Sequence, residues 1–151
     1  MDKIEQFNIN SKELLNKIEW LEKFKLQAAL KGYTPSEVHC IEAIEKIKNP
    51  NVIKLASSLY LTRGAISKLT KKLIEKKLIE SYKETNNKKE VYFKLTSRGK
   101  EIYEIHEKLN EEFRERDNIV FEQLTEVQFN YVLDFQEKYL KHLDMEIKKM
   151  V

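Results

Sequence analysis

Residues 51–77, NVIKLASSLYLTRGAISKLTKKLIEKK, carry the pattern that is most informative about the architecture of the chain. They hold two short amphipathic segments, and the helical spacing breaks at Leu61 and Thr62 between them. Asn51 can cap the first segment and Thr62 the second, because a short polar side chain there accepts a bond from the first turn. The apolar positions expected to face inward are Val52, Leu55, Ala56, Leu59, Ile66, Leu69 and Leu73. The pattern predicts two helices joined by a tight turn.

After Lys77 the apolar spacing changes from helical to alternating. We expect residues 78–83 and 90–95 to form two strands around a turn at residues 85–88, since asparagine tolerates turn backbone. Val91, Phe93 and Leu95 should face the core. Two helices and a hairpin in this order predict a mainly α fold with a small β-hairpin wing, a winged helix-turn-helix.

Helices are also expected on both sides of this module. One should run from Ser11 to about Lys31, with residues 1–9 as a loose arm and Gly32 as the terminating glycine. Residues 34–37, Thr-Pro-Ser-Glu, form a capping box for a second helix that stops at residues 49–50. Thr96 can cap a helix through Ile102, Ile105, Leu109 and Phe113. A last helix opens at residues 125–128 and carries Val132, Phe135, Tyr139, Leu143 and Ile147.

The composition narrows the class of protein. Of 151 residues, 41% are hydrophobic and 35% charged, with 3 Gly and 2 Pro, which favours long solvated helices. No uninterrupted apolar run exceeds three residues, and the start has no apolar signal region, so we expect neither membrane insertion nor secretion. A single cysteine fits a reducing compartment, and we expect a cytoplasmic protein.

The positive charge is concentrated in the middle of the chain. Residues 52–100 carry 13 positive and 4 negative side chains, whereas the remainder has a net charge of −6. A basic module of this kind suits a polyanion, although a solvated lysine-rich surface has the same composition. The helix that starts after Thr62 has one apolar side and one basic side, and a major groove admits one helix.

Double-stranded DNA is therefore the expected partner. Gly64 and Ala65 would let the start of the helix approach DNA closely, and the lysines of the hairpin would reach a neighbouring groove or the backbone. The residues expected to contact DNA are Thr62, Arg63, Gly64, Ala65, Ser67, Lys68, Lys71, Lys72, Lys88 and Lys89.

From Tyr33 to His106 the chain resembles the MarR-type winged-helix transcriptional regulators. The resemblance rests on residues 34–37, 54–69, 73–80, 87–89 and 94–100. It implies a homodimer on a pseudo-palindromic operator, with a dimerisation helix at 1–33, a DNA-binding domain at 34–96 and dimerisation helices at 97–151. Asn87 and Lys89 stand where the family usually has Asp and Arg, and Lys77 replaces a common glycine.

Family members commonly release DNA when a small ligand binds between the DNA-binding lobe and the dimer helices. Such an effector site would involve Trp20, Phe24, Tyr33, His39 and Tyr103, although aromatics at this spacing are more often core or dimer contacts. His39 and His106 resemble ligand positions of zinc-sensing relatives, but Asn110 replaces a further ligand. We expect no metal and no other cofactor. Cys40 looks buried, which disfavours thiol sensing.

Two functions of different classes remain open. The leading hypothesis is a sequence-specific DNA-binding regulator, a ligand-responsive repressor that acts as a homodimer. The alternative is a helical protein-interaction module that keeps the winged-helix scaffold without binding DNA. The sequence lacks the phosphate-binding and nucleophile motifs of enzymes, so we expect no enzymatic activity.

Overall fold

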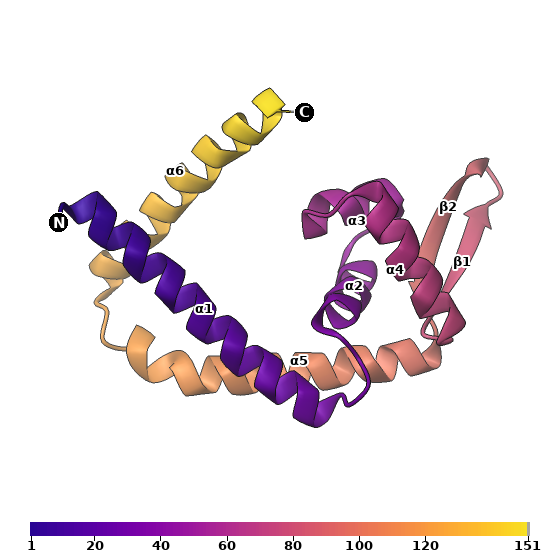
Figure 1. Ribbon diagram of the computed structural model, residues 1–151, viewed down its shortest axis with the longest axis horizontal. Helices are drawn as coiled ribbons and strands as arrows, with labels where there is room; N and C mark the ends of the chain where they lie inside the picture. The colour runs from indigo at the N-terminus through magenta and orange to yellow at the C-terminus, as the bar shows by residue number, and fades with distance from the viewer. Residues whose placement is uncertain (151) are drawn as a thin grey trace. The chain divides into compact units, whose positions relative to one another are not determined.

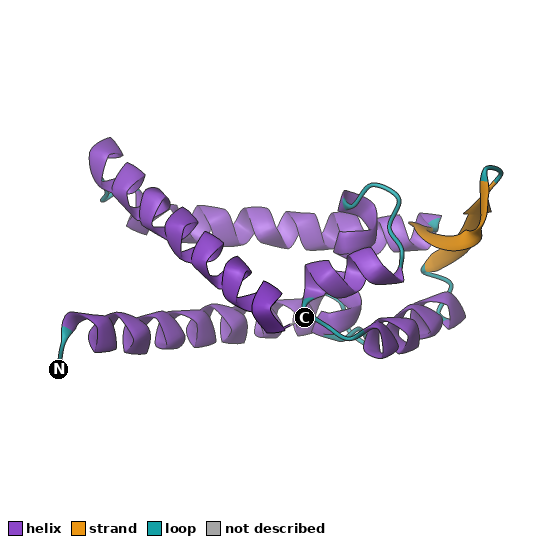
Figure 2. Cartoon of the chain, turned by 90° about the horizontal axis from the view of Figure 1, so that it is seen from above, coloured by secondary structure: helices purple, strands orange, loops and turns teal. Residues whose placement is uncertain are grey.

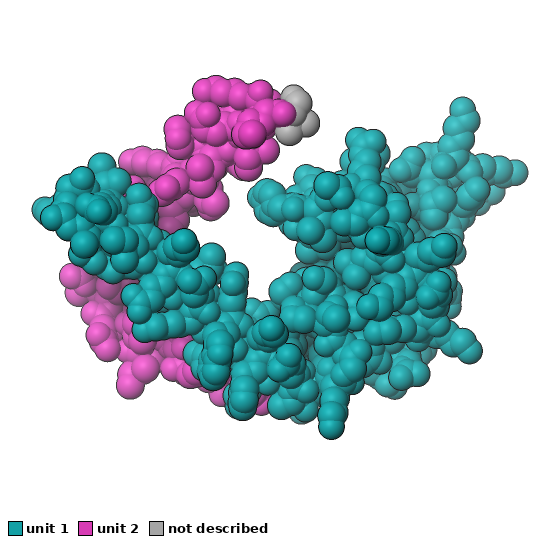
Figure 3. All heavy atoms as spheres, in the orientation of Figure 1, with its two compact units in different colours: residues 1–110 teal, residues 111–151 magenta. Residues whose placement is uncertain are grey.

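The computed structural model describes residues 1–150, which fold as six helices and one two-stranded antiparallel sheet (Figure 1). The chain divides into two compact units, residues 1–110 and 111–151, which Figure 3 shows in different colours. The elements in chain order are α1 (Lys3–Ala29), α2 (Pro35–Lys46), α3 (Val52–Leu59), α4 (Arg63–Glu75), β1 (Ile79–Glu84), β2 (Asn87–Leu95), α5 (Ser97–Phe121) and α6 (Glu126–Met150). The winged helix-turn-helix with flanking helices is therefore the fold observed.

Helix α1 begins earlier than the sequence pattern suggested. The expectation of a loose arm at residues 1–9 is wrong, because the helix starts at Lys3. Asp2 caps it, and its carboxylate accepts a bond of 2.7 Å from the backbone N–H of Glu5. This aspartate is a better start signal than Ser11, which lies inside the helix. Gly32, just beyond the end of α1, has φ of 93° and turns the chain toward α2.

Helix α2 forms the centre of the winged module. Its capping box is present: the Thr34 hydroxyl accepts from the Glu37 N–H, and the Glu37 carboxylate accepts from the Thr34 N–H. The helix contacts α3, α4 and β2, and it buries Val38, Cys40, Ile41 and Ile44 among them. It ends at Lys46, a little before the predicted stop at residues 49–50.

The two short helices follow the predicted caps. Asn51 accepts from the Lys54 N–H at the start of α3, and Thr62 accepts from the Ala65 N–H at the start of α4. Leu55, Ile66 and Leu73 are fully buried between the helices, while Leu69 is only half-buried. Tyr60 ends α3 with a left-handed backbone, φ 53°, which makes the turn between α3 and α4 tight.

The hairpin differs from the prediction in its turn and in one inward residue. Its two-residue turn is Thr85–Asn86, and Glu84 pairs with Asn87, so the turn is tighter than the predicted 85–88 (Figure 2). Phe93 and Leu95 are buried as expected. Val91 is 38% exposed, which corrects its assignment to the core. It lies in the middle of β2, two residues nearer the turn than the buried Phe93.

The last two helices are long, and much of their apolar surface is exposed. Thr96 caps α5 by accepting from the Gly99 N–H, and Thr125 and Gln128 form the predicted capping box of α6. Helix α5 buries Ile102, His106 and Leu109, whereas Ile105, expected to face inward, is 38% exposed. Helix α6 buries none of its described side chains. No helix within residues 1–150 has both the length and the apolar character needed to cross a membrane.

Candidate nucleic-acid interface

Helix α4 presents a basic side to the solvent. Arg63, Gly64, Ser67, Lys68, Lys71 and Lys72 are all exposed, and Ala65 is half-buried. The opposite side is anchored by Ile66, Thr70 and Leu73, each at most 3% exposed. A helix held along one side with cations along the other has the form that fits a major groove.

Thr70 is an anchor that the sequence pattern did not reveal. Its hydroxyl donates to the carbonyl of Ile66 at 2.9 Å and also contacts the carbonyl of Ser67 at 3.2 Å. These bonds satisfy the hydroxyl within the helix, so the residue can be buried without an unpaired polar group. In the sequence, only the position of Thr70, four residues after Ile66, indicates that it lies on the inward side of the helix.

A buried carboxylate lies behind the C-terminal end of α4. Glu37 is 1% exposed, and its Oε2 lies 2.7 Å from the Lys76 Nζ just after α4. Its Oε1 lies 3.8 Å from the Lys72 Nζ. Lys72, predicted to contact DNA, therefore has an acidic neighbour on the inner side, although its side chain remains 53% exposed. The sequence pattern predicts only the capping role of Glu37.

The wing is tied to the start of α3 by one asparagine. Asn51 uses its Oδ1 to cap α3 and its Nδ2 to donate to the Glu90 carboxylate on β2 at 2.9 Å. A backbone bond from the Phe93 N–H to the Pro50 carbonyl, 3.0 Å long, adds a second tie. The two bonds hold β2 against the start of α3.

The hairpin lysines sit just after the turn rather than at its tip. Lys88 and Lys89 lie on β2 and are exposed. The Asn87 side chain accepts from the backbone N–H groups of Lys89 and Glu90 at 3.2 and 3.3 Å. The residue that replaces the family's usual Asp therefore keeps an acceptor oxygen, and it holds the backbone that carries both lysines.

Lys77 occupies a position that ordinarily favours glycine. Its φ is 61°, and its carbonyl accepts from the Thr96 hydroxyl at 2.8 Å. The Leu78 N–H returns to the Leu73 carbonyl at 3.0 Å and closes the end of α4. The chain thus enters the wing through a left-handed residue even without a glycine.

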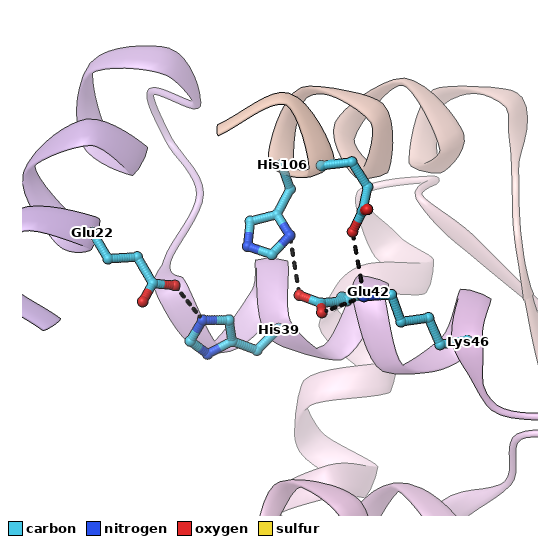
Figure 4. Close-up of polar contacts among 6 residues, drawn as sticks. Glu22, His39, Glu42, Lys46 and His106 are labelled. Carbon is cyan, nitrogen blue, oxygen red and sulfur yellow. Dashed lines mark hydrogen bonds and ion pairs between the residues drawn. The ribbon is translucent and has the colours of Figure 1, made fainter. Parts of the chain in front are cut away.

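A second polar cluster lies between α2 and the flanking helices (Figure 4). The His39 Nε2 lies 3.0 Å from a carboxylate oxygen of Glu22 on α1, and the His106 Nδ1 lies 3.0 Å from a carboxylate oxygen of Glu42. His106 is 2% exposed, and its Nε2 has no hydrogen-bonding partner among the described residues. Glu22 and Glu42 were not singled out from the sequence, because their spacing shows only helix faces.

Two overlapping sets of three side chains here could hold a cation: Glu22, His39 and His106, and Glu42, His106 and Glu107. Glu22, His39 and His106 each offer one ligand atom, and these atoms lie within 4.8 Å of one another. Three ligands are fewer than a closed tetrahedral site requires. The expectation that the chain binds no metal stays a prediction.

The five residues expected to line an effector site have different surroundings. The Trp20 and Phe24 rings stack with their centroids 5.8 Å apart, and the two side chains are 66% and 60% exposed. The centroid of the Tyr33 ring lies 5.2 Å from the Lys76 Nζ. His39 lines two open clefts beside α2, with volumes of about 300 and 230 Å³. Tyr103 is half-buried on α5. The effector site therefore stays a prediction.

Cys40 is fully buried in α2, and burial raises the pKa of its thiol to about 12. A thiol in this state has little nucleophilic thiolate, which agrees with the expectation that it does not act as a sensor.

Comparison with known proteins identifies the family. Residues 33–91 match the model of the MarR family. The HTH-type transcriptional regulator PchR of Bacillus subtilis (strain 168) is 32% identical over 111 residues, which cover 74% of this chain and 66% of PchR. This chain therefore spans slightly less than two thirds of that relative.

Solved structures support the same fold. Streptococcus pneumoniae FabT, in complex with DNA, superposes with a TM-score of 0.76 at 19% identity, covering 99% of this chain and 100% of FabT. The S. aureus MepR–DNA complex gives a TM-score of 0.69 at 22% identity, covering 94% and 96% of the two chains. The curated relatives are named as transcriptional regulators and not as enzymes. The match of residues 33–91 to the family model, together with the curated relative PchR, shows that this winged module belongs to the MarR family.

Proposed function

We propose that the protein is a transcriptional regulator that binds double-stranded DNA as a homodimer and represses transcription until an effector binds. The observation that carries DNA binding is the exposed basic side of α4, which lies opposite an anchored apolar side. The wing adds two exposed lysines on the same module. Residues 34–96 would bind DNA, and residues 1–33 and 97–151 would form the dimer.

The flanking helices support the homodimer. Leu26 is the only buried residue among those described in α1, and α6 buries none. Long amphipathic helices that leave this much apolar surface exposed are stable when a partner covers it. A symmetric dimer would place its two α4 helices in major grooves about one helical turn apart, roughly 10 base pairs.

The effector response is proposed from the position of the two clefts beside His39. One lies between α1 and α2, and the other lies between α2, the helix that packs on α4, and α3. A ligand there could favour one arrangement of these helices and so change DNA affinity, because a ligand shifts an equilibrium only by its differential affinity for two states.

The decisive experiment selects bound duplexes from a random pool with the full chain. DNA-binding regulation predicts an inverted repeat whose half-sites lie about 10 base pairs apart. The affinity for the selected duplex should fall with salt with a log–log slope steeper than about −4, because several phosphates are contacted by each dimer.

Two substitutions test the assignment of roles within the interface. Arg63→Ala should relax the sequence preference, whereas Lys89→Ala should weaken all duplexes similarly and reduce the salt slope by about 1. Recovery of no enriched sequence, together with no retention of DNA at low salt, would favour the protein-interaction module instead.

A further inference from the structure

The buried carboxylate of Glu37 joins two parts of the winged module, the start of α2 and the end of α4. It closes the capping box at the start of α2, where it accepts from the Thr34 N–H at 3.1 Å. It also pairs with the Lys76 Nζ at 2.7 Å, directly after the last turn of α4. Through one side chain, the start of α2 is therefore bonded to the end of the helix that carries the basic side.

Lys76 is held from two further directions. Its Nζ lies 5.2 Å from the centre of the Tyr33 ring and 3.4 Å from the Gly32 carbonyl. Tyr33 and Gly32 form the connection from α1 to α2. The end of α4 is thus bonded to the link between the winged module and its first flanking helix, and not only to α2.

These polar contacts differ in kind from the apolar anchors of α4. Ile66 and Leu73 hold the helix by burial, which is non-directional and allows the helix to tilt or rotate slightly. A short charge-assisted bond to a buried carboxylate fixes the separation of the two groups, and the further contacts of the Lys76 Nζ with Gly32 and Tyr33 restrict its direction. Glu37 is buried and Lys76 is 32% exposed, and a pair of this kind adds little net stability, which leaves geometry as the contribution to test.

We propose that Glu37 and Lys76 form a positioning pair that sets the direction of α4 relative to α1, so that the two recognition surfaces of a dimer match one operator spacing. This inference rests on the proposed DNA-binding function. The pair would therefore contribute to the choice between DNA sequences. A small tilt of α4 would displace the side chains that contact bases, whereas long lysine side chains could still reach the phosphates.

The test compares two DNA probes and a set of variants of the full chain. The first probe is the duplex enriched in the selection described above, and the second is a shuffled duplex of the same length and composition. Glu37→Gln removes the charge but keeps the shape of the side chain. Glu75→Gln is the matched control, because it removes one negative charge from an exposed position next to Lys76.

Glu37→Gln should lower the ratio of enriched to shuffled affinity by at least about tenfold, while affinity for the shuffled duplex stays within about threefold of wild type. Lys76→Arg, which keeps a cation able to bond the carboxylate, should retain the wild-type ratio. The double variant Glu37→Gln/Lys76→Met removes both partners without leaving a buried unpaired charge, and it should lose discrimination as the single variant does.

Circular dichroism at the assay temperature checks that each variant is folded. If Glu37→Gln and the double variant discriminate as well as Glu75→Gln does, the proposal is overturned. It is equally overturned if affinity for both duplexes falls in parallel, since that would indicate a general loss of structure. If the wild-type chain showed no preference between the enriched and the shuffled duplex, that result would contradict the proposed DNA-binding function and not the role of the Glu37–Lys76 pair.

Discussion

Glu37 shows how opposing local effects decide the charge state of one residue. Burial raises the pKa of its carboxyl, but the hydrogen bond from Lys76 and those from the backbone and hydroxyl of Thr34 lower it more, so that the net shift is downward from 4.5. A group with a lowered pKa in the folded state contributes stability above its unfolded pKa. That contribution is lost as the pH falls through the folded value.

We therefore predict that the free energy of unfolding decreases below about pH 4.5 and that Glu37→Gln flattens part of this decrease. Urea unfolding at several pH values between neutrality and acid measures the slope. Glu75→Gln, at an exposed position, provides the comparison, and an identical slope in both variants would contradict the prediction.

Gly64 lies at the start of α4, where a substitution should affect both the stability of the helix and its approach to DNA. A Cβ added there would meet only the Thr62 Oγ1, at 4.0 Å, so alanine fits without strain. Gly64→Ala should raise the free energy of unfolding by up to about 1 kcal/mol, because alanine favours the helix. It should also weaken DNA binding, since the added methyl group projects from the exposed start of α4. Thermal unfolding and a DNA titration on the same sample measure both effects, and tighter binding would show that this end does not approach DNA.

At the scale of elements, the contact between α5 and the entry to the wing is unusually close. A Cβ on Gly99 would lie 2.1 Å from the Leu78 carbonyl oxygen, which is backbone and also accepts from the Thr96 N–H. The wing and the first turn of α5 can therefore meet only if residue 99 has no side chain.

Gly99→Ala should accordingly destabilise the protein by about 1–3 kcal/mol, because the backbone of either the wing or α5 must move. Urea unfolding measures the loss, and Gly64→Ala serves as the same substitution at a position with open space. An unchanged free energy of unfolding would mean that the two elements separate without cost.

Sequence patterns were sufficient to predict where most of the helices begin, but not which way every side chain faces. The caps Thr34, Asn51, Thr62, Thr96 and Thr125 were all identified correctly, because capping depends on residues within one turn. The orientation of Val91 and of Ile105 was predicted wrongly, since alternation or helical spacing does not show where a neighbouring element ends. His106 is buried in α5 next to Ile105, where it contacts Glu42 and the His39 ring on α2.

At the scale of the whole molecule, the exposed apolar residues of the flanking helices govern the expected assembly. Within α6, Leu140 is 62% exposed and Leu143 and Ile147 are 43% and 44% exposed. Such side chains recur at helical spacing, so they form a continuous stripe that a second copy can cover.

We predict that Leu143→Asp shifts the protein from dimer to monomer and reduces affinity for the selected duplex by at least about tenfold, because both half-sites are no longer bound together. Sedimentation velocity measures the assembly state. Asn130→Asp adds the same charge to α6 away from this stripe and should leave the dimer intact. A dimeric Leu143→Asp variant would place the interface elsewhere.

The helix-turn-helix, the wing, their caps and the basic side of α4 could all be predicted from the sequence, because these features depend on residue spacing and on contacts within a few residues. Only the tertiary structure revealed the Glu37–Lys76 pair, the Asn51–Glu90 tie and the cluster of Glu22, His39, Glu42 and His106. Each of these contacts joins residues far apart in the chain, and a charged or polar residue on a helix has the same local pattern whether it faces solvent or a distant partner.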